Sequence, residues 1–172
     1  MSFKKALIYD PKNEETRQLV RQLEVNLTIA EQTILRKLEN NPDNSVLHKQ
    51  LGKIYQAQSL YNNAIEQYER VLSQNPESIE AVYDLATLYA DQGQYPTAIA
   101  YMKQTIVLQP ENPAHDYNIA CLYAIQKMPV AAMSYLKKAL GKGYTNWNLI
   151  RTDDDLQSIR ETEEFKQLIR NR

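Results

Sequence analysis

The chain has 172 residues, 43% of them apolar, so it can bury a core and is not a disordered segment. Its 20 Lys and Arg against 21 Asp and Glu give a net charge of −1, which argues against nucleic acid or an anionic membrane as partner. The single cysteine, Cys121, excludes an internal disulfide framework. The sequence shows no signal-peptide pattern and no long apolar run, which favours a cytoplasmic protein without membrane insertion.

A period of 34 residues runs through the chain. Identical or similar residues stand one period apart in four sets: Tyr55, Tyr89 and Tyr123; Ala64, Ala98 and Ala132; Leu51, Leu85 and Ile119; Pro42, Pro76 and Pro110. So many coincidences at one offset indicate a repeat protein, in which neighbouring units bury each other's apolar faces.

The first 44 residues follow this period only in part. We expect residues 1–12 to be the second half of an incomplete repeat, which indicates either a piece of a longer protein or an N-terminal end that packs against something. Residues 13–44 are expected to form an irregular helix pair, with a capping pattern of Thr28 and Glu31 at the start of the second helix. Pro11 and Pro42 are 31 residues apart rather than 34, so one long helix is the alternative.

Three complete periods follow, at 45–78, 79–112 and 113–146. Each contains two stretches of apolar residues at helical spacing, joined by a short turn. In the second period the turn contains Gly93, and in the third Asn112 is expected to cap the first helix. Residues 147–172 leave the period and predict short helices that cover the apolar edge of the last repeat.

The residues at the repeated positions resemble the tetratricopeptide repeat (TPR) family. The first complete copy reads Leu51-Gly52, Tyr55, Ala64, Tyr68 and Pro76. Residues 143–165 resemble the segment that follows the last repeat in many bacterial TPR proteins, through Gly143, Tyr144, Trp147, Asp153, Asp155, Leu156 and Phe165. The resemblance implies an all-α fold, a right-handed superhelix of antiparallel helix pairs (a TPR solenoid) with a helical C-terminal cap. It also implies that Gly52, Ala86 and Ala120 let the two helices of a repeat approach each other.

Signatures of catalysis and metal binding are absent from the sequence. His48 and His115 fall in different repeats, and a packing role is expected for His48. The carboxylates of residues 153–155 are a candidate cation site, but negative charge at a helix N-terminus is stabilising in itself. Cys121 has no neighbouring base in the sequence to activate it. We therefore expect no enzyme, no cofactor and no metal.

The resemblance implies a protein-binding scaffold whose concave groove is lined by the first helix of each repeat. By family position, the groove residues are Lys49, Lys53, Gln56, Tyr83, Asp84, Thr87, Tyr117, Asn118 and Cys121. The two lysines favour an acidic segment of the partner near the first complete repeat, and Tyr83 and Tyr117 are expected to be exposed anchors. Two alternatives are self-association through exposed solenoid ends, giving a homo-oligomer, and a regulatory interaction domain of a larger enzyme or transporter.

Overall fold

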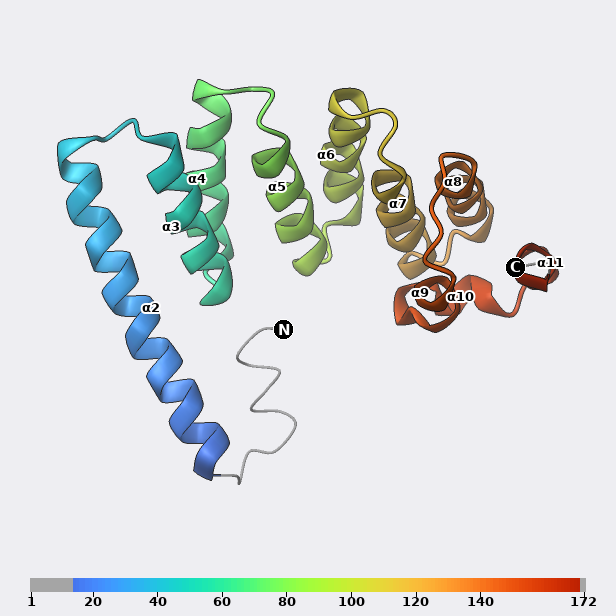
Figure 1. Ribbon diagram of the computed structural model, residues 1–172, viewed down its shortest axis with the longest axis horizontal. Helices are drawn as coiled ribbons and strands as arrows, with labels where there is room; N and C mark the ends of the chain where they lie inside the picture. The colour runs from blue at the N-terminus through green and yellow to red at the C-terminus, as the bar shows by residue number, and fades with distance from the viewer. Residues whose placement is uncertain (1–13, 171–172) are drawn as a thin grey trace. The chain divides into compact units, whose positions relative to one another are not determined.

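The computed structural model describes residues 14–170, and every regular element in that range is a helix (Figure 1). The helices are α2 (Glu14–Asn40), α3 (Ser45–Ala57), α4 (Tyr61–Gln74), α5 (Ile79–Asp91), α6 (Tyr95–Leu108), α7 (Pro113–Ile125), α8 (Pro129–Gly141), α9 (Trp147–Thr152), the 3-10 helix η1 (Asp154–Leu156), α10 (Gln157–Arg160) and α11 (Glu163–Arg170). The predicted all-α fold is confirmed, whereas the half-repeat expected at 1–12 lies outside the described residues. The described residues divide into two compact units, 14–81 and 82–170.

Residues 14–40 form one continuous helix, α2, so the expectation of two helices is wrong (Figure 1). Thr28 does not act as a helix cap, because its hydroxyl donates to the carbonyl of Glu24 one turn earlier, at 3.0 Å. The hydroxyl of Thr33 donates to the carbonyl of Ile29 in the same way, at 2.8 Å. No glycine or proline lies between residues 14 and 40, so nothing interrupts the helical hydrogen bonds.

Helices α3 and α4 form the first complete pair and pack through a glycine. Asn44 caps α3 by accepting hydrogen bonds from the main-chain N–H groups of residues 46 and 47, each at 3.1 Å. Inside the pair, a Cβ atom on Gly52 would lie 2.9 Å from Cζ of the fully buried Tyr68. The close approach implied for Gly52 is therefore present. His48 is buried, with Nδ1 at 2.8 Å from Oε1 of Gln67 and Nε2 at 2.7 Å from the carbonyl of Pro42, in keeping with the expected packing role.

In the second unit, alanines occupy the close contacts between helices. Ala86 on α5 and Ala98 on α6 are fully buried in one apolar cluster with Met102 and Ile119. Ala120 on α7 and Ala132 on α8 are fully buried in a second cluster. Asn112 accepts a hydrogen bond from the N–H of Ala114 at 3.1 Å and caps α7 as predicted. Small side chains at these positions let neighbouring helices pack closely.

The residues after α8 fold back onto α7 and α8. We call residues 147–170 the C-terminal segment; it contains α9, η1, α10 and α11 (Figure 1). Its apolar residues Ile150, Leu156, Ile159 and Phe165 are fully buried, in one cluster with Leu136 and other residues of α7 and α8. Burying these side chains contributes several kcal/mol at ~1.5–3 kcal/mol each, so the segment is an integral part of this unit.

The turn inside each repeat uses the same backbone conformation. Ser59, Gly93 and Lys127 stand 34 residues apart and have φ angles of 60°, 72° and 56°. Only one of the three is a glycine, although this left-handed region costs other L-residues ~1–2 kcal/mol. The period therefore extends to the backbone geometry of the turns.

None of the helices within residues 14–170 combines the length and the apolar character needed to cross a membrane.

Candidate functional site

A cavity of about 280 Å³ opens in the second unit between helices α5 and α7 and the start of the C-terminal segment. We call it the α5/α7 pocket. It is lined by Tyr83, Ala86, Thr87, Ala90, Met102, Tyr117, Asn118, Cys121, Leu122, Leu149, Asp153 and Asp155. Ligand pockets for small molecules begin at ~300 Å³, so this cavity suits one or two side chains rather than a cofactor.

Five of the nine predicted groove residues meet in this pocket: Tyr83, Thr87, Tyr117, Asn118 and Cys121. The helical turn and the 34-residue repeat together explain why they meet. Positions 83 and 87 lie one helical turn apart on α5, and positions 117 and 121 lie at the equivalent places on α7, one repeat later. The two helices therefore present matching faces, and the amide nitrogen of Asn118 lies 3.4 Å from the hydroxyl oxygen of Tyr83.

Tyr117 is not the exposed anchor that the sequence predicts, because Tyr144, in the connection after α8, and Asp153, in the C-terminal segment, cover it. Its side chain is only 4% exposed and stacks on Tyr144, with ring centroids 4.4 Å apart. Its hydroxyl donates to Oδ2 of Asp153 at 2.6 Å. Tyr83, at the equivalent position of the preceding repeat, has no such cover and is 37% exposed, as expected.

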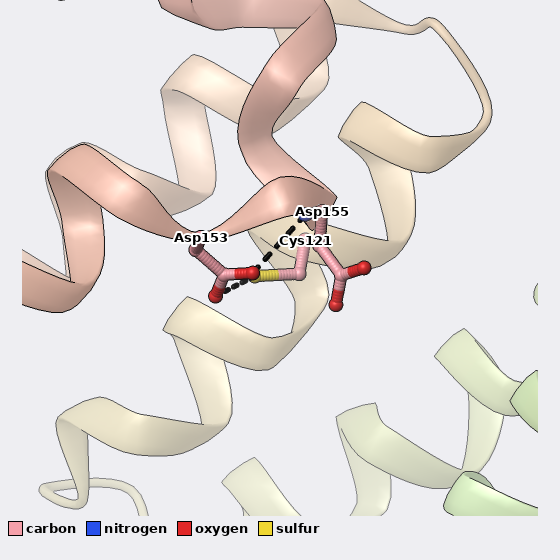
Figure 2. Close-up of side chains that lie close together, drawn as sticks. All are labelled: Cys121, Asp153 and Asp155. Atoms are coloured by element: carbon pink, nitrogen blue, oxygen red, sulfur yellow. Dashed lines mark hydrogen bonds between the residues drawn. The ribbon is translucent and has the colours of Figure 1, made fainter. Parts of the chain in front are cut away.

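Asp153 joins the C-terminal segment to α7, where its side chain lies beside Cys121 (Figure 2). Its Oδ2 accepts the hydrogen bond from Tyr117, and the thiol of Cys121 lies 3.8 Å from the same oxygen. Its Oδ1 accepts from the N–H of Asp155 at 3.1 Å and so caps the short helix η1. The predicted capping role of the acidic run is confirmed, and one carboxylate also contacts α7.

Burial, together with this carboxylate, raises the pKa values of the two neighbouring groups. Burial raises the pKa of the Cys121 thiol well above its usual range, and the charges of Asp153 and Asp155 raise it further. Burial and the hydrogen bond to Asp153 raise the pKa of the Tyr117 hydroxyl in the same direction. Both groups are therefore neutral hydrogen-bond donors at physiological pH. A protonated, buried thiol is a poor nucleophile.

Cys121, Asp153 and Asp155 are also the residues of the described chain that come nearest to a metal-binding set. One ligand atom from each lies within 4.8 Å of the other two (Figure 2). A thiol must lose its proton to bind a metal, and the raised pKa of Cys121 opposes that loss. The arrangement therefore favours the hydrogen-bonded, protonated thiol over a metal ligand.

The remaining predicted groove residues lie outside this pocket. In the first unit, Lys49 on α3 forms an ion pair with Glu80, and its charge and hydrogen bond lower the pKa of that carboxyl. Lys53 is exposed on the same helix. Oε1 of Gln56 lies 3.4 Å from the hydroxyl of Tyr68. Asp84, on α5 in the second unit, is half-buried and does not line the pocket.

The part of the pocket that comes from other elements is not evident from the sequence. Leu149, Asp153 and Asp155 belong to the C-terminal segment, and Met102 belongs to α6. The sequence identifies the acidic run as a helix cap and a candidate cation site, and gives no sign of its contact with α7. The period places first helices opposite one another, yet it carries no information about a segment that leaves the period.

Comparisons with known proteins agree with this architecture. Two family models, both described as tetratricopeptide repeat, match residues 43–110 and 83–145. No curated protein matches the sequence.

Several solved structures share the fold. A crystal structure of MamA is 18% identical, covers 87% of this chain and 88% of its own, and superposes with a TM-score of 0.69. YrrB, described as a TPR protein with an unusual peptide-binding site, is 15% identical over 99% of this chain and 88% of its own, with a TM-score of 0.64. A thermophilic TPR protein of Thermus thermophilus is 19% identical over 90% of this chain and 87% of its own, with a TM-score of 0.60. At these identities the likeness concerns the fold alone.

Proposed function

Because the chain belongs to the tetratricopeptide repeat family, we propose that it is a non-catalytic scaffold that binds a peptide segment or helix of a partner protein on the first-helix face of its repeats. The observation that carries this proposal is the α5/α7 pocket, where five predicted groove residues from two successive repeats meet. YrrB, which has the same fold, is itself described as having a peptide-binding site, and this is consistent with a peptide as the class of ligand.

The pocket has the composition of a docking site for a side chain. Its lining includes Ala86, Ala90, Met102 and Leu122, which offer apolar surface, and Tyr83, which is more than a third exposed. Burying one medium-sized apolar side chain contributes ~1.5–3 kcal/mol. Tyrosine is enriched among the residues that dominate binding energies, because it combines apolar area with a polar tip.

A catalytic function has little support in the residues that line the pocket. Its thiol and its buried phenol have raised pKa values and are protonated, so neither is an activated nucleophile or base. Both histidines are buried away from the pocket, His48 in the first unit and His115 at the start of α7. The proposal therefore assigns binding alone to this chain.

The proposed acidic segment of the partner at the first complete repeat rests on Lys53. Lys49 is already paired with Glu80, which reduces its attraction for an external carboxylate, whereas Lys53 is exposed on α3. An exposed ion pair contributes only ~0.2–1 kcal/mol, so this preference tunes the choice of partner and does not supply most of the affinity.

A selection from a random peptide library tests the proposal. Peptides enriched on the immobilised wild-type chain are synthesised with a fluorophore, and their affinities are measured by anisotropy for wild type and Tyr83→Ala. We expect the substitution to weaken binding about tenfold, or ~1.4 kcal/mol. The matched control is Tyr61→Ala at the first residue of α4, outside the pocket, which should leave the affinity unchanged. Equal affinity of all three proteins would place the peptide elsewhere.

Self-association is the second candidate, and one observation favours it. Leu19, Val25 and Ile29 on α2 are 60%, 53% and 58% exposed. Val25 and Ile29 lie one turn apart, so they form an apolar stripe suited to another helix. A molar mass that rises with protein concentration in sedimentation equilibrium would favour this candidate over a monomeric scaffold.

A further inference from the structure

We propose that the α5/α7 pocket takes an apolar side chain of the partner that stands beside a lysine or arginine, with the cation lying against Asp153 and Asp155. This inference rests on the proposed function and adds to it the chemistry of the bound segment. In this proposal the second unit prefers a basic segment of the partner, whereas the first complete repeat is proposed to prefer an acidic segment.

The charged residues that line the pocket are all acidic. Its twelve lining residues include two carboxylates, Asp153 and Asp155, and no lysine, arginine or histidine. Asp155 is exposed at the rim and Asp153 is half-buried beside it. An acidic segment would therefore meet like charge, whereas a lysine or arginine would meet opposite charge over an apolar wall.

The carboxylate of Asp153 is held in place by neutral donors. It accepts hydrogen bonds from the Tyr117 hydroxyl at 2.6 Å and from the N–H of Asp155 at 3.1 Å, and the Cys121 thiol lies 3.8 Å from it. Arg160 lies nearby, but its guanidinium donates to the main-chain carbonyl of Asp153, at 2.6 Å. Within residues 14–170 the Asp153 side chain takes part in no ion pair, so its charge is available to a ligand.

The pKa directions of the neighbouring groups agree with this geometry. Burial is the main cause of the raised pKa values of Tyr117, Cys121 and Tyr144, and the charge of Asp153 raises each of them further. A carboxylate that disfavours negative charge on its neighbours favours positive charge in the same place.

The apolar residues that line the pocket favour an apolar side chain of the partner. Ala86, Ala90, Met102, Leu122 and Leu149 are the aliphatic residues of the lining. A free metal ion would leave this surface exposed to water, and the protonated thiol of Cys121 is a poor third ligand. A side chain such as leucine covers the walls while a basic neighbour reaches the rim, so a polypeptide uses both halves of the pocket.

The test uses four short unlabelled peptides with a common Gly-Ser background. One position holds Leu or Ser, and the position two residues later holds Lys or Glu, so that both side chains lie on one side of an extended chain. Each peptide is titrated into the uniformly ¹⁵N-labelled full chain, and the amide signals of Tyr83, Asn118 and Asp155 report binding at the pocket.

We expect the Leu/Lys peptide to bind at least about fivefold more tightly than the Leu/Glu peptide, as for a partly exposed ion pair, and more tightly than either Ser peptide. Asp153→Asn should remove most of the Lys-over-Glu preference, because asparagine can still accept the hydrogen bonds from Tyr117 and the Asp155 N–H. Glu111→Gln, the same change of charge at an exposed site outside the pocket, should retain the preference.

The outcomes separate this inference from the proposed function. Shifts at the pocket amides with equal affinity for Lys and Glu peptides, or a preference that survives Asp153→Asn, would overturn the inference and leave the peptide-binding function standing. Absence of pocket shifts with all four peptides would contradict both. If Asp153→Asn disturbs the native amide spectrum, Asp155→Asn at the exposed rim provides the same comparison, with a smaller expected loss.

Discussion

Replacing Gly52 by alanine should destabilise the first unit, although alanine is the better helix former. A Cβ at this position would lie 2.9, 3.0 and 3.2 Å from three ring atoms of Tyr68, where ordinary carbon contacts lie at ~3.5–4.0 Å. The ring is fully buried, so it has little room to move. Overpacking of this kind costs ~1–3 kcal/mol, and the gain in helix propensity returns ~1 kcal/mol. We therefore expect a net loss of ~1 kcal/mol.

Gly141→Ala is the matched control for this substitution. Gly141 lies at the end of α8, and a Cβ there would have nothing within 4 Å. It should be neutral or stabilising by a few tenths of a kcal/mol, up to ~1 kcal/mol. Urea unfolding followed by circular dichroism at the helix band gives the free energy of unfolding of each variant.

The second repeat supplies a rescue. Ala86 and Met102 stand one period after Gly52 and Tyr68, and both are buried in one cluster. The double variant Gly52→Ala/Tyr68→Met therefore imports a pair that the protein already uses, and methionine adapts its shape readily. We expect a favourable coupling energy of ~1 kcal/mol or more in the double-mutant cycle. If Gly52→Ala were as stabilising as Gly141→Ala, or if the coupling were zero, the steric reasoning would be refuted.

Two further predictions concern the second unit. Lys127→Gly should stabilise it by ~0.5–1 kcal/mol, since glycine tolerates the φ of 56° at this turn, whereas Gln126→Gly at φ −75° should destabilise it; thermal unfolding distinguishes the two. The raised pKa of Cys121 keeps its thiol protonated in the folded state. The protonated thiol therefore contributes its full stability below the unfolded pKa of ~8.5, and this contribution is lost as the pH rises from there toward the folded pKa. Urea unfolding at pH 7, 8 and 9 should therefore show a steeper fall for wild type than for Cys121→Ala, and parallel curves would contradict the assignment.

The repeat and the packing inside it can be predicted from the amino-acid sequence alone. A period of 34 in tyrosine, alanine and proline is sufficient to place the helix pairs, because each repeat packs against its neighbour in the same way and uses similar residues for the contact. The same logic brought Tyr83 and Tyr117 to equivalent places on α5 and α7. Local rules also sufficed for Asn112 as the cap of α7, since capping involves only the first turn of a helix.

The features that involve contacts outside the period depend on how distant segments pack together. Thr28 and Glu31 match a capping pattern, yet uninterrupted helical hydrogen bonding carries α2 through them. Tyr117 and Tyr83 are equivalent in sequence, but Tyr144 and the C-terminal segment cover the first and leave the second exposed. Asp153 is a helix cap by its neighbours in sequence and part of the pocket by its contact with α7, 36 residues away. The repeat pattern describes how one repeat packs against the next. Burial at the end of the repeats depends on the C-terminal segment, which the pattern does not contain.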